Sequence, residues 1–221
     1  SSGGSLVGTI ANSGVLAFDT GSSLTVNNAI SGNGAVLINS GSVSYTSDQA
    51  YTGVTTIASG ASLSLGNSTA SGSVSGNITN SGSLAFNRSN PLTYGGVVSG
   101  NGGVSILAST VTFTNSQTYS GVTTIASGAT LVLGGSAGSV AGNVADSGVL
   151  TFDRTQTYGG VVSGNGAVNI SSGVARFTNA QTYSGVTTIA SGATLVLGGS
   201  SGSLAGNVNN SGVLTFDRTQ S

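Results

Sequence analysis

The amino-acid sequence predicts an all-β fold, a parallel β-helix of about ten coils of ~21 residues grouped in ~64-residue super-repeats. Three observations carry this prediction. Long segments recur, short segments alternate between apolar and small polar residues, and glycine returns at a regular interval. No apolar stripe with a period of 3.6 residues persists, so helices are not expected. The fold is therefore predicted from periodicity rather than from any single motif.

The strongest repeat is YSGVTTIASGATLVLGGS, which occupies Tyr119–Ser136 and returns unchanged at Tyr183–Ser200. A looser copy lies upstream, at Tyr51–Asn67. A second landmark, LAF or LTF, ends at Phe18, Phe86, Phe152 and Phe216, which are almost evenly spaced. These landmarks predict one repeat segment over 1–221, with a partial unit 1–50, units 51–118 and 119–182, and a partial unit 183–221.

A finer period lies inside each unit. Ten glycines recur at almost regular intervals, namely Gly8, Gly32, Gly53, Gly76, Gly100, Gly121, Gly142, Gly164, Gly185 and Gly206. We interpret the large unit as three coils of about 21 residues, with glycine at equivalent places in successive coils. Glycine, Asn and Ser tolerate the positive φ angles and tight geometry of such corners.

Each coil carries short strands that read apolar-x-apolar. Strict alternation over so few residues places one face inside and one outside, so we expect four side chains to point inward: Leu131, Leu133, Phe152 and Ile170. At a spacing of ~4.8 Å, ten coils would form a rod of roughly 48 Å. A β-propeller is the main rival, but the repeat length is not a multiple of a blade of about 40–45 residues.

Composition excludes several classes of function. The chain has 38 Gly, one Pro and no Cys or His, and its formal net charge is −1. Near-neutral charge opposes binding to nucleic acid. No apolar run approaches the ~18 residues of a membrane helix, so direct membrane insertion of this segment is not expected. A flexible linker is opposed by the 37% hydrophobic residues and their regular alternation.

Carboxylates offer the only acid–base candidates, because Glu, His, Lys and Cys are absent. Asp153 and Asp217 are equivalent in the repeat, and three coils would separate them by roughly 14 Å. Asp146 shares a coil with Asp153. Paired acid–base carboxylates need about 5–10 Å, so we expect exposed charged turns at Asp153-Arg154 and Asp217-Arg218. No catalytic, cofactor-binding or metal-binding residue is assigned, and no cofactor is expected.

Other motifs are weaker still. GGVVSGNG at Gly95–Gly102 has the glycines of a calcium-binding roll but no Asp. Threonine pairs such as Thr123-Thr124 could indicate an ice-binding face. They occur only once per three predicted coils, which is too sparse for the continuous row of threonines that such a face needs. Five tyrosines allow two interpretations, an exposed aromatic line for sugar contact or packing over strand ends, and packing is favoured: Tyr51, Tyr94, Tyr119, Tyr158 and Tyr183.

Phe113–Gly135 and Phe177–Gly199 resemble the passenger-associated repeat of bacterial autotransporters. The pattern is an aromatic residue, a Tyr-x-Gly-x-Thr step and a Gly-led Leu-x-Leu that ends in Gly. Ser42–Gly66 matches less well, with Tyr45 in the aromatic place and Asp48 in the linker. The resemblance implies a right-handed parallel β-helix on the bacterial outer-membrane surface or released from it. It brings no catalytic residue to transfer.

We therefore expect a non-catalytic extracellular β-helical stalk or adhesin segment that contacts a host or neighbouring-cell surface, a glycan or matrix. The alternative is a self-assembling extracellular fibre or sheath protein, favoured by the low charge and the absence of Lys from strand edges. A polysaccharide-active β-helix enzyme is the third interpretation. Both ends of the sequence keep the repeat pattern, since Leu6–Phe18 matches Val74–Phe86 and Ser211–Gln220 matches Ser147–Gln156. Open ends that stack on further repeats of the same chain, or on other copies, are expected.

Overall fold

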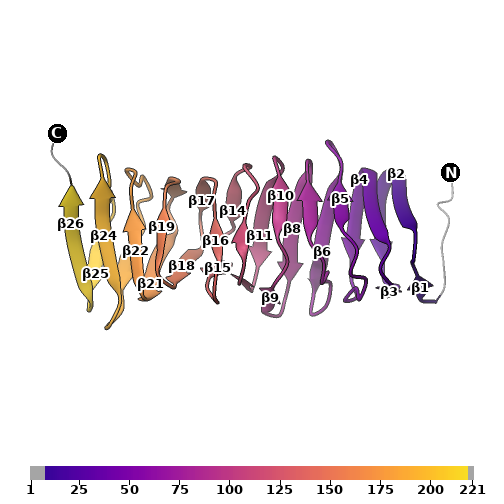
Figure 1. Ribbon diagram of the computed structural model, residues 1–221, viewed down its shortest axis with the longest axis horizontal. Helices are drawn as coiled ribbons and strands as arrows, with labels where there is room; N and C mark the ends of the chain where they lie inside the picture. Colours follow the sequence, from indigo (N-terminus) through magenta and orange to yellow (C-terminus); the bar gives the residue numbers. More distant parts are fainter. Residues whose placement is uncertain (1–7, 219–221) are drawn as a thin grey trace.

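The computed structural model describes residues 8–218 as one long rod of stacked β-strands, with its two described ends far apart (Figure 1). These residues contain no helix, and the strands stack in parallel over about 10 turns. Strand partners such as Phe152 with Ile170 and Thr55 with Ile78 come from successive turns. The predicted all-β solenoid is confirmed, with strands stacked about 20 residues apart.

Each coil contributes up to three short strands, which form three rows along the rod. Two long strands, β2 (Val15–Val26) and β4 (Ala35–Tyr45), span two rows each, because the first half of β4 pairs with β5 and its second half with β6. Row 1 takes their first halves and continues with β5 (Thr55–Ile57), β7 (Ile78–Asn80), β10 (Val98–Gly100), β13 (Ser116–Gln117), β16 (Ser139–Val140), β19 (Gln156–Tyr158), β22 (Val174–Phe177), β24 (Thr194–Gly199) and β26 (Val213–Arg218).

The other two rows follow the same order along the chain. Row 2 takes the second halves of β2 and β4, then β6 (Ser62–Thr69), β8 (Ser83–Arg88), β11 (Gly103–Ala108), β14 (Thr123–Ile125), β17 (Val144–Asp146) and β20 (Val162–Gly164). Row 3 contains β1 (Ile10–Ala11), β3 (Ile30–Ser31), β9 (Leu92–Tyr94), β12 (Thr110–Phe113), β15 (Thr130–Leu133), β18 (Val149–Asp153), β21 (Ala167–Ser172), β23 (Thr187–Ile189) and β25 (Val208–Asn210).

The core is a column of apolar side chains inside the three rows. In row 3, Phe113 pairs with Leu133, which pairs with Phe152. The four side chains predicted to point inward, Leu131, Leu133, Phe152 and Ile170, are all 0% exposed. Phe152 also lies edge to face with Phe177, with ring centroids 5.1 Å apart. Like residues therefore stack on like residues from coil to coil, as the alternation predicted.

The large repeat unit is not three coils, and this prediction was wrong. The motif Thr-Thr-Ile forms β5 in row 1, β14 in row 2 and β23 in row 3. From β14 the chain passes row 2 three more times, at β17, β20 and the bridge of Ala180 to Ser203, before it reaches β23 in row 3. Each unit is thus three coils plus one further strand. Identical sequences consequently lie on three different sides of the rod.

The ten predicted glycines also do not form one column. Gly121 lies against the carbonyl of Gly102, and Gly142 against the carbonyl of Gly121, so backbones meet there with no room for a side chain. A second kind of glycine position has a φ between 101 and 104° and contacts the backbone of an Asn or Asp in the preceding coil. It is occupied by Gly32, Gly100 and Gly164. Only glycine combines that φ with that close approach.

Buried glutamines join successive coils, one on each side of the rod. The Oε1 atom of Gln117 accepts a hydrogen bond from the backbone of Val98 at 2.7 Å, and its Nε2 donates to the carbonyls of Gly96 at 3.2 Å and Asn115 at 2.7 Å. Gln49 and Gln181 make equivalent bonds to Ile30 and Val162. These side chains satisfy backbone groups that would otherwise be buried without partners.

We expect Gln117→Leu to lower the free energy of unfolding by about 2–4 kcal/mol. The substitution removes the hydrogen-bond partner of three backbone groups, the Val98 amide and the carbonyls of Gly96 and Asn115. Gln156→Leu is the matched control, since the buried Nε2 of Gln156 has no hydrogen-bond partner. That substitution should change stability by no more than about 0.5 kcal/mol. Urea unfolding measures both, and equal losses would contradict the assigned role of Gln117.

Candidate functional surfaces and buried groups

The carboxylates do not converge on one site. Asp153 ends β18 in row 3, whereas Asp217 lies in β26 in row 1, so they are not stacked on one face as their equivalence predicted. Asp153 is exposed, and its Oδ1 accepts a hydrogen bond from Ser171 Oγ at 2.8 Å. Asp217 is exposed as predicted, but it lies in strand β26, paired with Gly198, and not in a turn. The side chain of Arg218 lies outside the described part of the structure.

Two ion pairs bridge coils that are two turns apart. Arg88 contacts Asp48 at 2.8 Å, and Arg176 contacts Asp217 at 2.7 Å. Partial burial acts to raise the pKa of Asp48, but hydrogen bonds from Ser73, Arg88 and the Gly72 amide lower it overall. Within residues 8–218, no group of three or more acidic or other metal-ligating side chains comes together. The described role of these charged side chains is therefore to form ion pairs between coils along the rod.

All six tyrosines are buried, so the exposed aromatic line for sugar contact is ruled out for the predicted residues. The hydroxyl of Tyr119 shares a hydrogen bond with Thr123 Oγ1 at 2.5 Å, and the same pair recurs as Tyr51 with Thr55 and Tyr183 with Thr187. Burial raises the pKa of Tyr119 to about 12. The packing interpretation is confirmed. The first threonine of each Thr-Thr pair is a buried partner of tyrosine, not a surface residue.

Small, uncharged side chains occupy the outward positions that pair along the middle of row 3. Successive outward positions that pair across the sheet are Thr93, Thr112, Val132, Thr151, Asn169, Thr188 and Asn209. One exposed valine recurs in each repeat, and its three copies lie before β5, β14 and β23, on three sides of the rod: Val54, Val122 and Val186. The described surface thus repeats one pattern in three directions.

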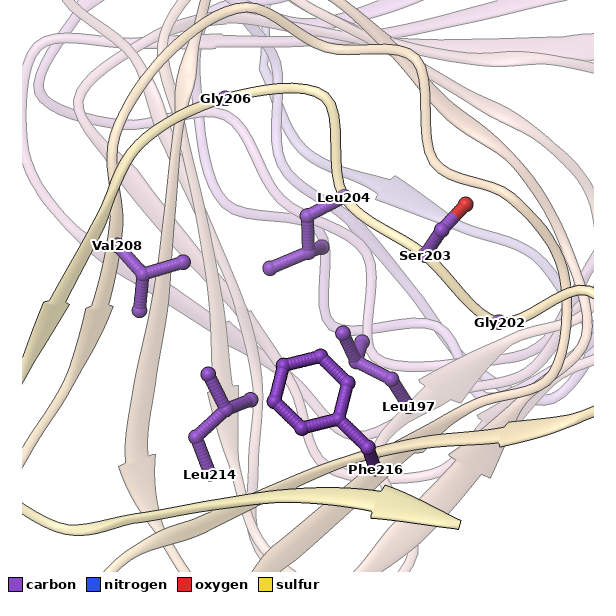
Figure 2. A pocket seen from close by; sticks show the side chains of 8 residues that line it. All are labelled: Leu197, Gly202, Ser203, Leu204, Gly206, Val208, Leu214 and Phe216. Atoms are coloured by element: carbon purple, nitrogen blue, oxygen red, sulfur yellow. The ribbon is translucent and has the colours of Figure 1, made fainter. Parts of the chain in front are cut away.

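One hollow of about 290 Å³ opens at the C-terminal end of the stack. Figure 2 shows the side chains of Leu204, Val208 and Leu214 pointing toward the ring of Phe216. Phe216 is 70% exposed, whereas its repeat equivalent Phe152 is 0% exposed under the rings of Tyr158 and Phe177. The hollow is therefore the open end of the apolar column, as predicted for this end. Residues 1–7, where part of the matching N-terminal prediction falls, lie outside the described residues.

Asp146, which the sequence analysis considered only as a carboxylate in the same coil as Asp153, is a buried carboxylic acid. It is 0% exposed, its Oδ1 accepts a hydrogen bond from the Gly148 amide at 2.9 Å, and its Oδ2 has no partner. Burial raises the pKa of Asp146 to about 6, although the amides of Gly148 and Leu150 favour the charged form. Aligning Asp-Ser-Gly at 146–148 with Asn-Ser-Gly at 12–14, 80–82 and 210–212 would have revealed it.

Comparisons with known proteins identify no relative. No family model, no curated protein and no solved structure matches the chain. Among the described residues, no helix is long and apolar enough to cross a membrane.

Proposed function

We propose that this chain is a non-catalytic, extracellular β-helical stalk or adhesin segment of an autotransporter-like surface protein. The observation that carries the proposal is the stack of parallel strands over about 10 turns. Large apolar side chains point inward along this stack, apart from the open C-terminal end, scattered valines and one leucine, Leu107. Such a rod is suited to holding a terminal part of a larger protein away from a surface.

The chemistry of the outside supports a structural or adhesive role rather than catalysis. The exposed carboxylates Asp153 and Asp217 lie in different rows, and Asp217 is engaged by Arg176 at 2.7 Å. Acid–base catalysis needs two such groups on one substrate. The described surface is instead made largely of small hydroxyl, amide and methyl groups, which suit many weak contacts to a glycan, a matrix or another cell.

Successive repeat units place the same sequence on different sides of the rod, which favours binding of a partner from any side. Val54, Val122 and Val186 occupy one sequence position but three rows, and they are 44%, 49% and 37% exposed. A partner that recognises the unit would find a copy on each side of the rod. Weak copies of one site gain avidity when several engage together.

Localisation and adhesion are tested separately. Intact cells that make the full-length protein are treated with a protease that cannot enter them, and released peptides from 89–154 are sought by mass spectrometry. Beads coated with the purified chain are then passed over host cells, matrix proteins and immobilised glycans, with albumin-coated beads as the control. We expect released peptides and retained beads. Peptides protected until lysis, together with no retention, would refute the proposal.

The alternative is a self-assembling fibre or sheath subunit, which is favoured by the low charge and the absence of lysine. The apolar ends of a solenoid normally need a cap. In the described residues, Leu197, Leu214 and Phe216 line an open end instead. A further coil would cover them, whether it belongs to the same polypeptide or to another copy.

For the fibre alternative, Phe216→Asp should abolish end-to-end association, because it places a charge on the surface that another coil would bury. Val54→Asp is the control, since Val54 is exposed on the side of the rod. Sedimentation at rising concentration should show association of the wild type and of the control, with little dependence on salt. A wild type that stays monomeric at high concentration refutes the fibre.

A further inference from the structure

One buried polar position recurs at the corner between successive strands. The Nδ2 of Asn80 donates a hydrogen bond to the Gly103 carbonyl of the next coil at 2.9 Å, and its Oδ1 accepts one from the Gly82 amide at 3.1 Å. Asn12 makes the same pair of bonds, to Ala35 at 2.9 Å and from Gly14 at 3.2 Å. The amide side chain thus fastens one coil to the next.

Asp146 occupies this position in the third copy of the motif. Its Oδ1 accepts from the Gly148 amide at 2.9 Å, as the asparagines do from their own glycines. Its Oδ2 stands where they have the donating Nδ2, and it is buried without a partner. By repeat equivalence with Ala35 and Gly103, the carbonyl that it faces is that of Ala167. An ionised carboxylate has no hydrogen to donate to a carbonyl.

We propose that Asp146 is a proton-controlled latch between two coils: when protonated, its carboxylic acid donates a hydrogen bond to the Ala167 carbonyl, and when ionised it repels that carbonyl and loosens the contact. The protonated acid restores the bond that asparagine makes in the other copies. The ionised form leaves two acceptors facing each other in a buried place, which is costly.

The surroundings of Asp146 give the ionised form no charged partner. Ile125 of β14 pairs with it from the coil below, and Gly164 and Gly166 lie against it from the coil above. None of these carries a charge, and a Cβ at Gly166 would overlap the carboxyl group. The titratable group that senses it is Tyr183, whose pKa is raised to about 12 by burial, with a smaller contribution from Asp146. Tyr183 therefore stays neutral while Asp146 titrates.

The direction of the pH effect follows from linkage. Burial raises the pKa of Asp146 from 3.8 to about 6, so the folded state holds a proton that the unfolded state has released. The stabilising contribution is complete below pH 3.8, falls as the pH rises to about 6, and is absent above that. A difference of about two pKa units corresponds to about a hundredfold loss in the folding equilibrium constant. Asp48, whose pKa is lowered, acts with the opposite sign.

The test compares the wild type with Asp146→Asn from pH 4 to pH 7, so that Asp48 contributes equally to both. Asp153→Asn is the matched control, because Asp153 is exposed. We expect Asp146→Asn and the wild type to unfold at similar urea concentrations at pH 4. At pH 7 the variant should be more stable by about a hundredfold in the folding constant. Asn80→Asp should add a second loss of the same sign.

Two local readouts separate a latch from a general change in stability. Carbon NMR of the Asp146 carboxyl should titrate near pH 6, and amide exchange around 166–168 at pH 7 should be faster in the wild type than in Asp146→Asn. Comparing variants at one pH cancels the intrinsic pH dependence of exchange. A carboxyl that titrates near its ordinary value, an Asp146→Asn protein that is less stable at pH 7, or equal pH dependence of both proteins overturns the proposal.

Discussion

Leu133→Asp is expected to unfold the coils around it, with a loss of more than about 4 kcal/mol, and is one of the two largest effects that we expect. Leu133 is 0% exposed and pairs with Phe113 below and Phe152 above. A carboxylate in this column has no cation and no water to solvate it, so the protein must neutralise it or open. Leu133→Ala should cost less, about 2–5 kcal/mol, because it leaves a cavity but buries no charge.

Asp153→Asn is the control for charge and position. Asp153 ends the same strand that carries Phe152, but its side chain is exposed and bonds to Ser171 Oγ at 2.8 Å. Its removal should change stability by no more than about 0.5 kcal/mol. Thermal melts of the three variants measure the order of the losses. Losses of equal size for Leu133→Asp and Asp153→Asn would refute the inward and outward assignment of this strand.

The in-and-out pattern could be predicted from the sequence because it is local. Alternation at Leu131, Leu133 and Phe152 fixes which side chains share a face, whatever the length of the coil. The number of coils per unit could not be fixed in this way. It depends on which strands pair, and the corners between strands make some coils shorter, as between Phe152 and Ile170, and others longer, as between Thr55 and Ile78. Each repeat unit then contains one strand more than three coils.

In the candidate sites, too, local patterns could be predicted from the sequence, whereas contacts between coils could not. The Tyr-x-Gly-x-Thr step predicted a recurring pair, but only the structure shows that Tyr119 and Thr123 bond to each other inside the rod. Asp146 was considered only as a carboxylate near Asp153, and its burial was not predicted, because an aspartate beside Ser and Gly is typical of a turn. Its burial depends on the coil above, where Gly166 provides the space that the carboxyl group occupies. That contact is non-local and has no sequence signal within the motif.

Gly121→Ala is the second change from which we expect a large effect, although it adds a single methyl group. A Cβ at Gly121 would lie closer to the carbonyl oxygen of Gly102 than the 3.0 Å that real Cβ atoms essentially never cross. The obstacle is backbone in the neighbouring coil, not the end of a flexible side chain. Coil spacing is fixed at about 4.8 Å by the ladder of hydrogen bonds, so the clash can be relieved only by separating the coils.

We expect Gly121→Ala to cost about 3 kcal/mol or more, and Gly185→Ala to cost a similar amount, because Gly185 meets the carbonyl of Gly166 in the same way at another corner. Gly95→Ala is the matched control, since its added Cβ would meet only Thr114 Oγ1 at 3.7 Å. That change should be neutral, or stabilising by up to about 1 kcal/mol through the unfolded state. Urea unfolding of the three variants distinguishes the cases. A Gly121→Ala protein as stable as Gly95→Ala would mean that the coils are not in backbone contact at this corner, and the close stacking on which the rod depends would be disproved there.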